Sequence, residues 1–253
     1  MTVDKSPQRI RAMFGEIAPR YDLLNHLLSA GIDRWWRRRT VRLAPASREG
    51  PVLDVCTGTG DLALAYWRWR QGQLPVVGVD FCRPMLQLGR EKIRRAEAAG
   101  KVALLEADAL SLPFPDDLFQ VVCIAFGLRN LADPDRGLRE MARVCRPGGR
   151  VAVLEFSLPR SRRLRAIYGW YFGRVLPRIG QALARNRQGA YNYLPASVGE
   201  FFQRELLVRR MEQAGLGGVR CYRLTFGIAS LYVGGKGFRV QGSGTGRVGM
   251  VSE

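Results

Sequence analysis

PVLDVCTGTGDLALAYWRWR (51–70) is a short apolar run, followed by a glycine-containing turn and then by a helix-forming segment. An apolar run that ends in glycines is typical of a buried parallel strand. Gly58 and Gly60 permit a tight turn and a close approach of the backbone to a ligand. The stretch therefore predicts a strand (51–56), a ligand-binding turn and a helix (61–70), which together open a nucleotide-binding α/β sheet.

The same alternation continues along the chain. We predict further strands at 75–80, 102–108, 119–126 and 150–156, helices at 84–99 and 135–145, and a stop at Pro147–Gly149. Strands that alternate with helices at this spacing indicate α/β class, a doubly wound, Rossmann-like sheet. A helix at 201–215 and a closing hairpin, VRCYRLT with IASLYVG, complete the prediction. The expected domains are an N-terminal helical cap (1–48), the sheet domain (49–236) with a helical insertion at 157–198, and a frayed tail (237–253).

Composition excludes several classes of protein. The 253 residues are 47% hydrophobic and 25% charged, which is globular rather than disordered. The five cysteines lie far apart in sequence, which argues against a zinc knuckle or disulfide framework, and Cys56 and Cys123 are expected to be buried. No signal-peptide core and no long apolar segment is present, so we predict a soluble cytoplasmic protein. The net charge of +18 predicts a polyanionic partner, either nucleic acid or an anionic membrane.

Carboxylates follow the predicted strands where a nucleoside would bind. Asp80 ends the second strand, 20 residues beyond Gly60, and is placed to accept both ribose hydroxyls. Asp108 ends the third strand, where an adenine amino group would lie. Gly58, Gly60 and Ala63 also match a dinucleotide pattern, but Asp54 and Asp61 surround the loop with negative charge. That charge favours a cationic ligand, S-adenosylmethionine, over the pyrophosphate of NAD.

The chain resembles the quinone-biosynthesis C-methyltransferases, the demethylmenaquinone and ubiquinone-precursor enzymes. The resemblance rests on YDLLNHLLSAGIDRWW (21–36), DVCTGTGDLA (54–63), LPFPDDLFQVVCIAFGLRN (112–130), RVCRPGGRVAVLEFS (143–157), YNYLPAS (191–197) and LTFGIASLYVGGK (224–236). It implies a class I methyltransferase fold and donor contacts at Thr59, Asp80, Asp108 and Ala109. Ala125 stands where the family often has Ser, and Asp33 where it commonly has His.

The implied reaction is C-methylation of a prenylated quinol, which needs no metal. We favour demethylmenaquinol as the acceptor, with the ubiquinone precursor 2-methoxy-6-polyprenyl-1,4-benzoquinol as the alternative. Arg129, just past the fourth strand, is placed to stabilise a phenolate, and Asn130 to hold the ring oxygen or a water that accepts a proton. Tyr21 and Asp22 are predicted to belong to a lid over the acceptor. His26, the only histidine, is expected to be structural or superficial.

The positive charge is concentrated in residues 158–223, which hold 13 arginines and three acids. An arginine-rich segment with interleaved aromatics is typical of a surface that lies on anionic lipid. We therefore expect peripheral binding to the inner face of the cytoplasmic membrane and no nucleic-acid partner. The alternatives are an RNA or DNA methyltransferase, a membrane- or protein-binding module with a relic nucleotide pocket, and a dehydrogenase.

Overall fold

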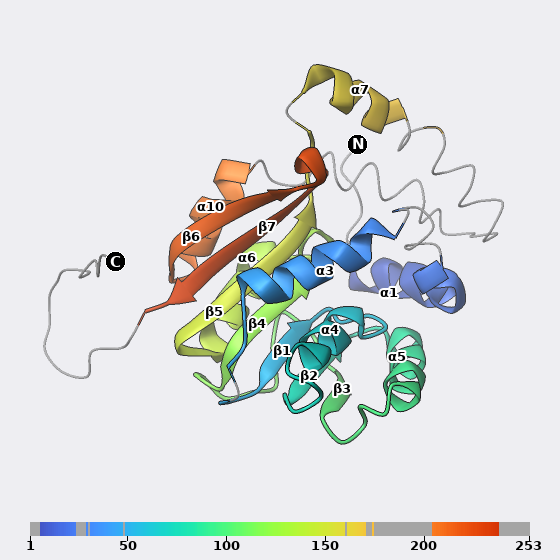
Figure 1. Cartoon of the computed structure of the whole chain (residues 1–253), viewed down its shortest axis with the longest axis vertical. Coiled ribbons are helices and arrows are strands. Elements are labelled where there is room, and N and C mark those ends of the chain that lie inside the picture. The colour runs from blue at the N-terminus through green and yellow to red at the C-terminus, as the bar shows by residue number, and fades with distance from the viewer. Residues whose placement is uncertain are drawn as a thin grey trace, which may run out of the picture.

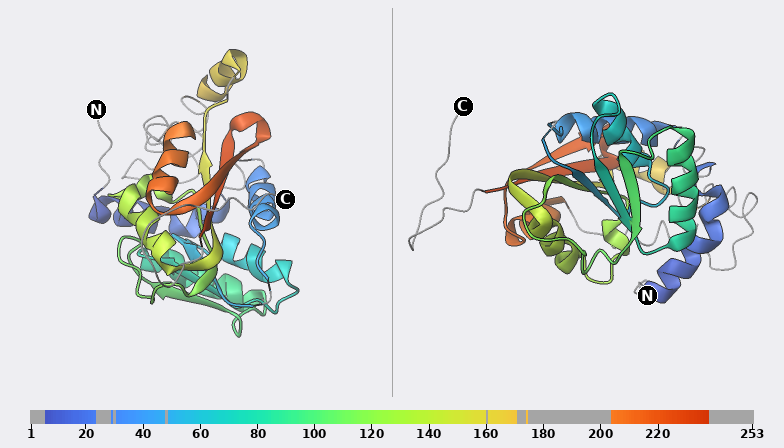
Figure 2. Two further views of the ribbon diagram at one scale, coloured as in Figure 1. Left: turned by 90° about the vertical axis from the view of Figure 1, so that its left-hand side faces the viewer. Right: turned by 90° about the horizontal axis from the view of Figure 1, so that it is seen from below.

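The computed structural model of the chain describes residues 6–23, 29, 31–47, 49–159, 161–170, 174 and 204–237. A twisted central sheet lies between two layers of helices, and a further helix, α1, lies near one edge of the sheet (Figures 1 and 2). His26, for which we predicted a structural or surface role, lies outside the described residues. So do the motif at 191–197 and most of the expected insertion.

The sheet has seven strands in the order β3-β2-β1-β4-β5-β7-β6. The first five run parallel, and β7 is antiparallel to both β5 and β6. Their bounds are β1 (Val52–Val55), β2 (Val76–Asp80), β3 (Val102–Glu106), β4 (Phe119–Ala125), β5 (Cys145–Phe156), β6 (Leu216–Leu224) and β7 (Ala229–Lys236). The direction of winding reverses between β1 and β4, and ligands of such sheets bind at that point, beyond the carboxyl ends of the strands.

Two apolar cores separate the sheet from its helices. On one face, α3 (Ile32–Leu43), α4 (Asp61–Trp69) and α5 (Arg83–Arg95) cover Val52, Val76 and Val121. On the other face, α6 (Pro134–Val144) and α10 (Arg204–Gln213) cover the strand residues Leu53, Val122 and Val151. Successive strand residues point to opposite faces, and both faces are buried, so these strands are apolar throughout. The doubly wound fold predicted from the sequence is confirmed.

The described part of the segment predicted to be an N-terminal cap, called the cap below, contains α1 (Pro7–Ile17), the short 3₁₀ helix η1 (Ala18–Arg20) and α3. Ile10, Met13 and Ile17, spaced three and four apart, form the buried stripe of α1, together with Phe14, Tyr21 and Phe81. On α3, Trp36 is buried, whereas its neighbour Trp35 is 48% exposed.

Three predicted boundaries were wrong. The helix expected to reach 99 ends at Arg95, because Glu97 adopts a left-handed conformation (φ 58°). The third strand ends at Glu106, so Asp108 lies just beyond it. Residues Pro147–Gly149 do not stop the chain before β5. They lie within it as an irregularity in the pairing with β4, where the register shifts between Phe119 and Val121.

The C-terminal part begins with α7 (Arg162–Trp170). The predicted hairpin is confirmed: β6 and β7 pair antiparallel, and the 3₁₀ turn η4 (Thr225–Gly227) joins them. The predicted tail lies almost wholly outside the described residues. Within the described part of the chain, no helix combines the length and apolar character needed to cross a membrane.

Candidate cofactor and acceptor site

A cavity of about 240 Å³ opens at the carboxyl edge of the sheet, around the point where the winding reverses. Its described lining comes from the loops after β1, β2, β3 and β4, and from α1 and Tyr21 of the cap. Predicted site residues in this lining are Tyr21, Gly58, Asp80, Asp108, Ala109, Ala125 and Asn130. Segments far apart in sequence therefore meet in one concave site.

Asp80 fixes the glycine loop at the floor of the site. Its carboxylate accepts the backbone N–H of Gly58 at 2.8 Å and that of Cys82 at 2.9 Å. Burial raises the pKa of Asp80, and hydrogen bonds from the backbone of Cys82 and Gly58 oppose that shift. A carboxylate has about four lone-pair positions, so it can accept ribose hydroxyls as well as these backbone donors.

The loop after β3 supplies the next wall. The Asp108 carboxylate accepts the backbone N–H of Leu110 at 2.9 Å, and Ala109 beside it is buried. Gly58, in a left-handed conformation (φ 57°), lies close to both Met85 and Tyr21, since a side-chain carbon added there would be 3.3 Å from the Met85 methyl group. The missing side chain at Gly58 therefore leaves space between the glycine loop, Met85 and Tyr21.

Asp54, predicted to face the ligand, serves the loop instead and is absent from the described cavity lining. Its Oδ2 accepts the Thr57 hydroxyl at 2.6 Å and the Ala63 backbone N–H at 3.0 Å. Burial raises the pKa of Asp54 to about 7, against the effect of these hydrogen bonds. The side chain thus joins the end of β1 to the first turn of α4.

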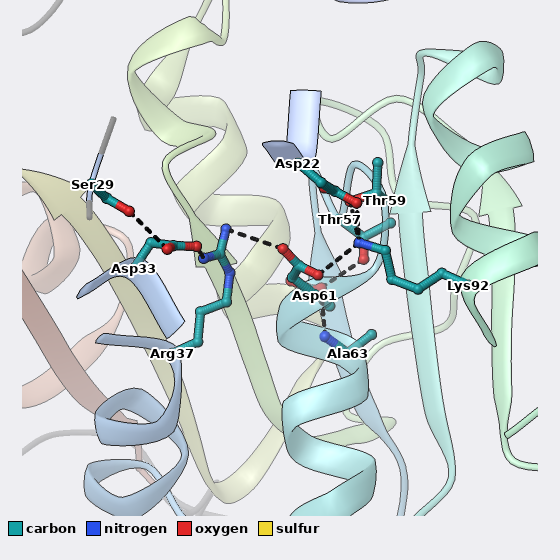
Figure 3. Close-up of polar contacts among 10 residues, drawn as sticks. Asp22, Ser29, Asp33, Arg37, Thr57, Thr59, Asp61, Ala63 and Lys92 are labelled. Atoms are coloured by element: carbon teal, nitrogen blue, oxygen red, sulfur yellow. Dashed lines mark hydrogen bonds and ion pairs between the residues drawn. The ribbon is translucent and has the colours of Figure 1, made fainter. Parts of the chain in front are cut away.

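Thr59 likewise points into a polar network rather than into the cavity (Figure 3). Its hydroxyl donates to Asp22 at 2.6 Å and accepts from Lys92 Nζ at 2.9 Å. Lys92, on α5, also contacts Asp61 at 2.7 Å. The network ties Asp22, two residues after η1, to the glycine loop, to α4 and to α5.

The network corrects the charge argument drawn from Asp61. That carboxylate pairs with Lys92, lies 3.8 Å from Arg37 of α3 and is absent from the described cavity lining, so its charge is directed to the network rather than to a ligand in the cavity. Arg37 in turn pairs with Asp33, which also accepts the Ser29 hydroxyl at 2.8 Å. Sequence reasoning missed Lys92 and Arg37, although Asp33 and Arg37 have the i, i+4 spacing of a helical ion pair.

Arg129 is buried next to the turn that lines the cavity, but it is absent from the described cavity lining. Its Nη1 donates to Glu155 at 2.8 Å and to the Phe126 carbonyl at 2.7 Å, and its guanidinium lies over the Phe156 ring. Its Nε is buried and has no hydrogen-bond partner among the described residues. Asn130, which does line the cavity, donates to the same Phe126 carbonyl at 3.2 Å. Glu155 was not foreseen; its place at the end of the fifth predicted strand was the available signal.

Cys56 was expected to be a buried core residue, but it lies in the cavity lining and is half-buried. Its φ of 53° ends β1 and turns the side chain out of the strand. Burial, followed by the carboxylate of Asp80, raises the pKa of the Cys56 thiol. Cys123 is fully buried, as predicted.

The sheet order, the cavity at the winding reversal and the carboxylates after β2 and β3 define a class I, Rossmann-like methyltransferase. An S-adenosylmethionine-dependent methyltransferase of Thermotoga maritima has the same fold, with a TM-score of 0.60 and 18% identity over 88% of this chain and 98% of that chain. The family model for the ubiE/COQ5 methyltransferase family matches residues 1–236, and the chain belongs to this family.

Curated relatives cover nearly the same length. The chain is 52% identical, over 88% of its length and 99% of the relative's, to the demethylmenaquinone methyltransferase of Thermus thermophilus. It is 49% identical, over 92% of its length and 90% of the relative's, to the ubiquinone/menaquinone biosynthesis C-methyltransferase of Geobacter sulfurreducens.

Proposed function

We propose that this methyltransferase uses S-adenosylmethionine to methylate a ring carbon of a prenylated quinol, with demethylmenaquinol as the preferred acceptor. The observation that carries the proposal is one cavity lined both by Asp80 and Asp108 and by the Phe126–Asn130 turn. The relatives named above act in quinone biosynthesis, which supports the acceptor class. The ubiquinone precursor is the second candidate, since the Geobacter relative carries both quinones in its name.

The chain's part at the cofactor end is to bind and orient. When bound, S-adenosylmethionine supplies an electrophilic methyl group. Asp80 would accept hydrogen bonds from the ribose hydroxyls, and Asp108 with Ala109 would contact the adenine. Gly58, which has no side chain, would let the ligand lie close to the protein backbone. Ala125 would contact the donor without a side-chain hydrogen bond. Asp54, Thr59 and Gly60 would act indirectly, by holding the loop in shape.

At the acceptor end the chain must favour the ionised quinol. A phenol titrates near ~10, so a nearby cation or hydrogen-bond donor is needed to stabilise the phenolate at neutral pH. We assign as donor to the ring oxygen the Nε–H of Arg129, which is buried outside the described cavity lining and has no hydrogen-bond partner among the described residues. Glu155 offsets the charge of Arg129, so this donor acts mainly by hydrogen bonding. Asn130 would hold the ring oxygen or a water that takes the ring proton after the carbon–carbon bond forms.

The cap would complete the site by excluding water and aligning the two substrates. Tyr21 lines the cavity and lies near Gly58. Asp22 would anchor this lid through Thr59 and Lys92. Because the acceptor is a membrane lipid, we also propose that the enzyme works peripherally at an anionic membrane surface.

Labelled S-adenosylmethionine incubated with each reduced acceptor tests the proposal. We expect label in the ring methyl group of menaquinol, with a lower kcat/KM for the benzoquinol precursor. Transfer to neither quinol would refute the proposed function. A higher kcat/KM for the benzoquinol would reverse the preference while keeping the reaction.

A further inference from the structure

The turn η4 presents an aromatic side chain to solvent in an unfavourable backbone conformation. Phe226, at its centre, is 82% exposed and has φ 57° and ψ 16°. Thr225 before it also has a positive φ, of 44°. A left-handed conformation is uncommon for residues other than glycine, asparagine and aspartate, and such strain is concentrated at functional positions. We therefore consider the exposed side chain of Phe226 as a contact point for a binding partner.

Further apolar and basic residues surround the turn. The segment after β5 runs beside it, since Ser157 donates its N–H to the Ile228 carbonyl at 2.8 Å and its hydroxyl to the Gly227 carbonyl at 2.7 Å. Leu158, next in the chain, is 46% exposed. The helix α7 follows, and it lies with η4 at one end of the molecule (Figures 1 and 2).

The segments 157–170 and 225–228, together called the tip below, carry charge of a single sign. Arg162, Arg163 and Arg165 of α7 are exposed, and Trp170 at its end is 56% exposed. Neither residues 157–170 nor residues 225–228 contain an aspartate or glutamate. Arginines around exposed aromatic and aliphatic groups complement a surface that is anionic outside and apolar within, which describes a bilayer of acidic phospholipid.

The tip is also connected to the cavity. Thr225 accepts the indole N–H of Trp36 at 2.8 Å. The Trp36 ring lies 5.8 Å from that of Phe126 and 5.9 Å from that of Phe156, and Phe126 lines the cavity. Ala229, just after the turn, pairs with Phe156 at the carboxyl end of β5, so η4 lies at the same edge of the sheet as the cavity.

We propose that Phe226 and Leu158 insert into an anionic bilayer, with the arginines of α7 on its headgroups, and that this tip admits the quinol tail toward the Trp36–Phe126–Phe156 rings. The membrane contact stands on the exposed tip itself. The route for the tail rests on the proposed function, since it requires a prenylated acceptor.

Vesicle flotation with the full chain tests the contact. We expect binding to phosphatidylcholine vesicles that contain phosphatidylglycerol, little binding without it, and weakening between about 0.1 and 1 M salt as the Debye length falls from about 10 Å to about 3 Å. Phe226→Ser should lower the partition coefficient about tenfold, the effect of exposing one large apolar side chain, and Phe226→Trp should restore it. Replacing Arg162, Arg163 and Arg165 with Gln should lower it by a similar factor or more.

Trp69→Ser is the matched control, because Trp69 is 40% exposed at the far end of α4, away from the cavity edge. It should bind vesicles like wild type. Normal affinity for S-adenosylhomocysteine would show that Phe226→Ser and Trp69→Ser are folded. Vesicle binding of folded Phe226→Ser equal to that of wild type would overturn the proposal, as would wild-type protein that does not bind anionic vesicles.

Kinetics separate this inference from the proposed function. Phe226→Ser should raise KM for a long-tailed quinol in vesicles about tenfold and leave that for a water-soluble short-tailed quinol unchanged. Equal effects on both quinols would remove the route for the tail. If wild type methylates neither quinol, the proposed function fails, and flotation still decides the membrane contact.

Discussion

Arg129 Nη1 and Glu155 Oε2 lie 2.8 Å apart, with both side chains buried. Glu155 is the last residue but one of β5 and Arg129 lies in the turn after β4, so the pair joins neighbouring strand ends at the edge that carries the cavity. Glu155 also accepts the Arg129 backbone N–H at 3.2 Å. The pair therefore fixes both the guanidinium and the turn that supplies Phe126 and Asn130 to the cavity wall.

Removing Glu155 should leave the Arg129 charge buried without its partner. We expect Glu155→Ala to lower the free energy of unfolding by about 3–5 kcal/mol. The double variant Glu155→Ala with Arg129→Met should lose less than the sum of the single changes, because neither charge then remains unpaired. Urea unfolding measures both. Additive losses would mean that the two side chains do not stabilise each other.

Arg129→Ala should impair turnover far more than cofactor binding. Loss of a donor used mainly in the transition state lowers kcat and kcat/KM together, here by about 100-fold. Arg139→Ala, on an exposed arginine of α6, is the control and should behave like wild type. A normal kcat in folded Arg129→Ala would confine this residue to its contacts with Glu155 and Phe126.

Asp80→Ala should weaken S-adenosylhomocysteine binding by about tenfold or more, because a hydrogen bond to a carboxylate contributes about 1.5–3 kcal/mol. Part of the loss would come from the Gly58 loop, which Asp80 also holds. Asp80→Asn should bind with intermediate affinity. Calorimetric titration gives the three dissociation constants, and the exposed Asp116→Asn is the control. Wild-type affinity in folded Asp80→Ala would rule out this nucleoside site.

Asp54 should make stability depend on pH. Its pKa is about 7 in the folded protein, against 3.8 for an ordinary aspartate, so the folded state binds an extra proton between these values. The contribution of Asp54 to the free energy of unfolding is therefore largest below the lower pKa and falls as pH rises through about 7, by at most about 1.4 kcal/mol per pH unit. Asp54→Asn keeps an acceptor for Thr57 and Ala63 and cannot titrate.

Urea unfolding between about pH 5 and pH 8 compares the two proteins. The stability of Asp54→Asn relative to wild type should rise with pH and level off above about 7. Other groups with raised pKa, such as Asp80, are present in both proteins and largely cancel in the difference. A difference that does not vary with pH would show that Asp54 is already ionised in the acidic range.

Lys92→Met should loosen the cap. Lys92 contacts Asp22, Thr59 and Asp61, and its loss removes a cation shared by two partly buried carboxylates, while Arg37 remains 3.8 Å from Asp61. We expect faster proteolysis within residues 7–43 and a several-fold weaker affinity for S-adenosylhomocysteine, by analogy with a lost charged hydrogen bond of about 1.5 kcal/mol. Arg95→Met, on the exposed side of α5, should change neither. Unaltered proteolysis in Lys92→Met would separate the network from cap closure.

The sequence by itself determined the parallel core and the glycine turn at the proposed cofactor site. Both depend on local signals: runs such as VLDV and VVGVD are apolar because parallel strands are buried on both faces, and Gly58 and Gly60 mark a turn that other residues adopt at a cost. The positions of Asp80 and Asp108 followed, since carboxyl ends of parallel strands meet at one edge.

Only the tertiary structure decided what each polar side chain does at that edge. Asp54, Asp61 and Asp80 were all predicted to lie around the ligand. In the structure Asp80 faces the cavity, Asp54 holds a loop and Asp61 pairs with Lys92 from another helix. The same holds for Arg129, whose partner Glu155 lies 26 residues away. Charge pairing between distant segments depends on how the helices pack, and no local pattern of residues encodes it.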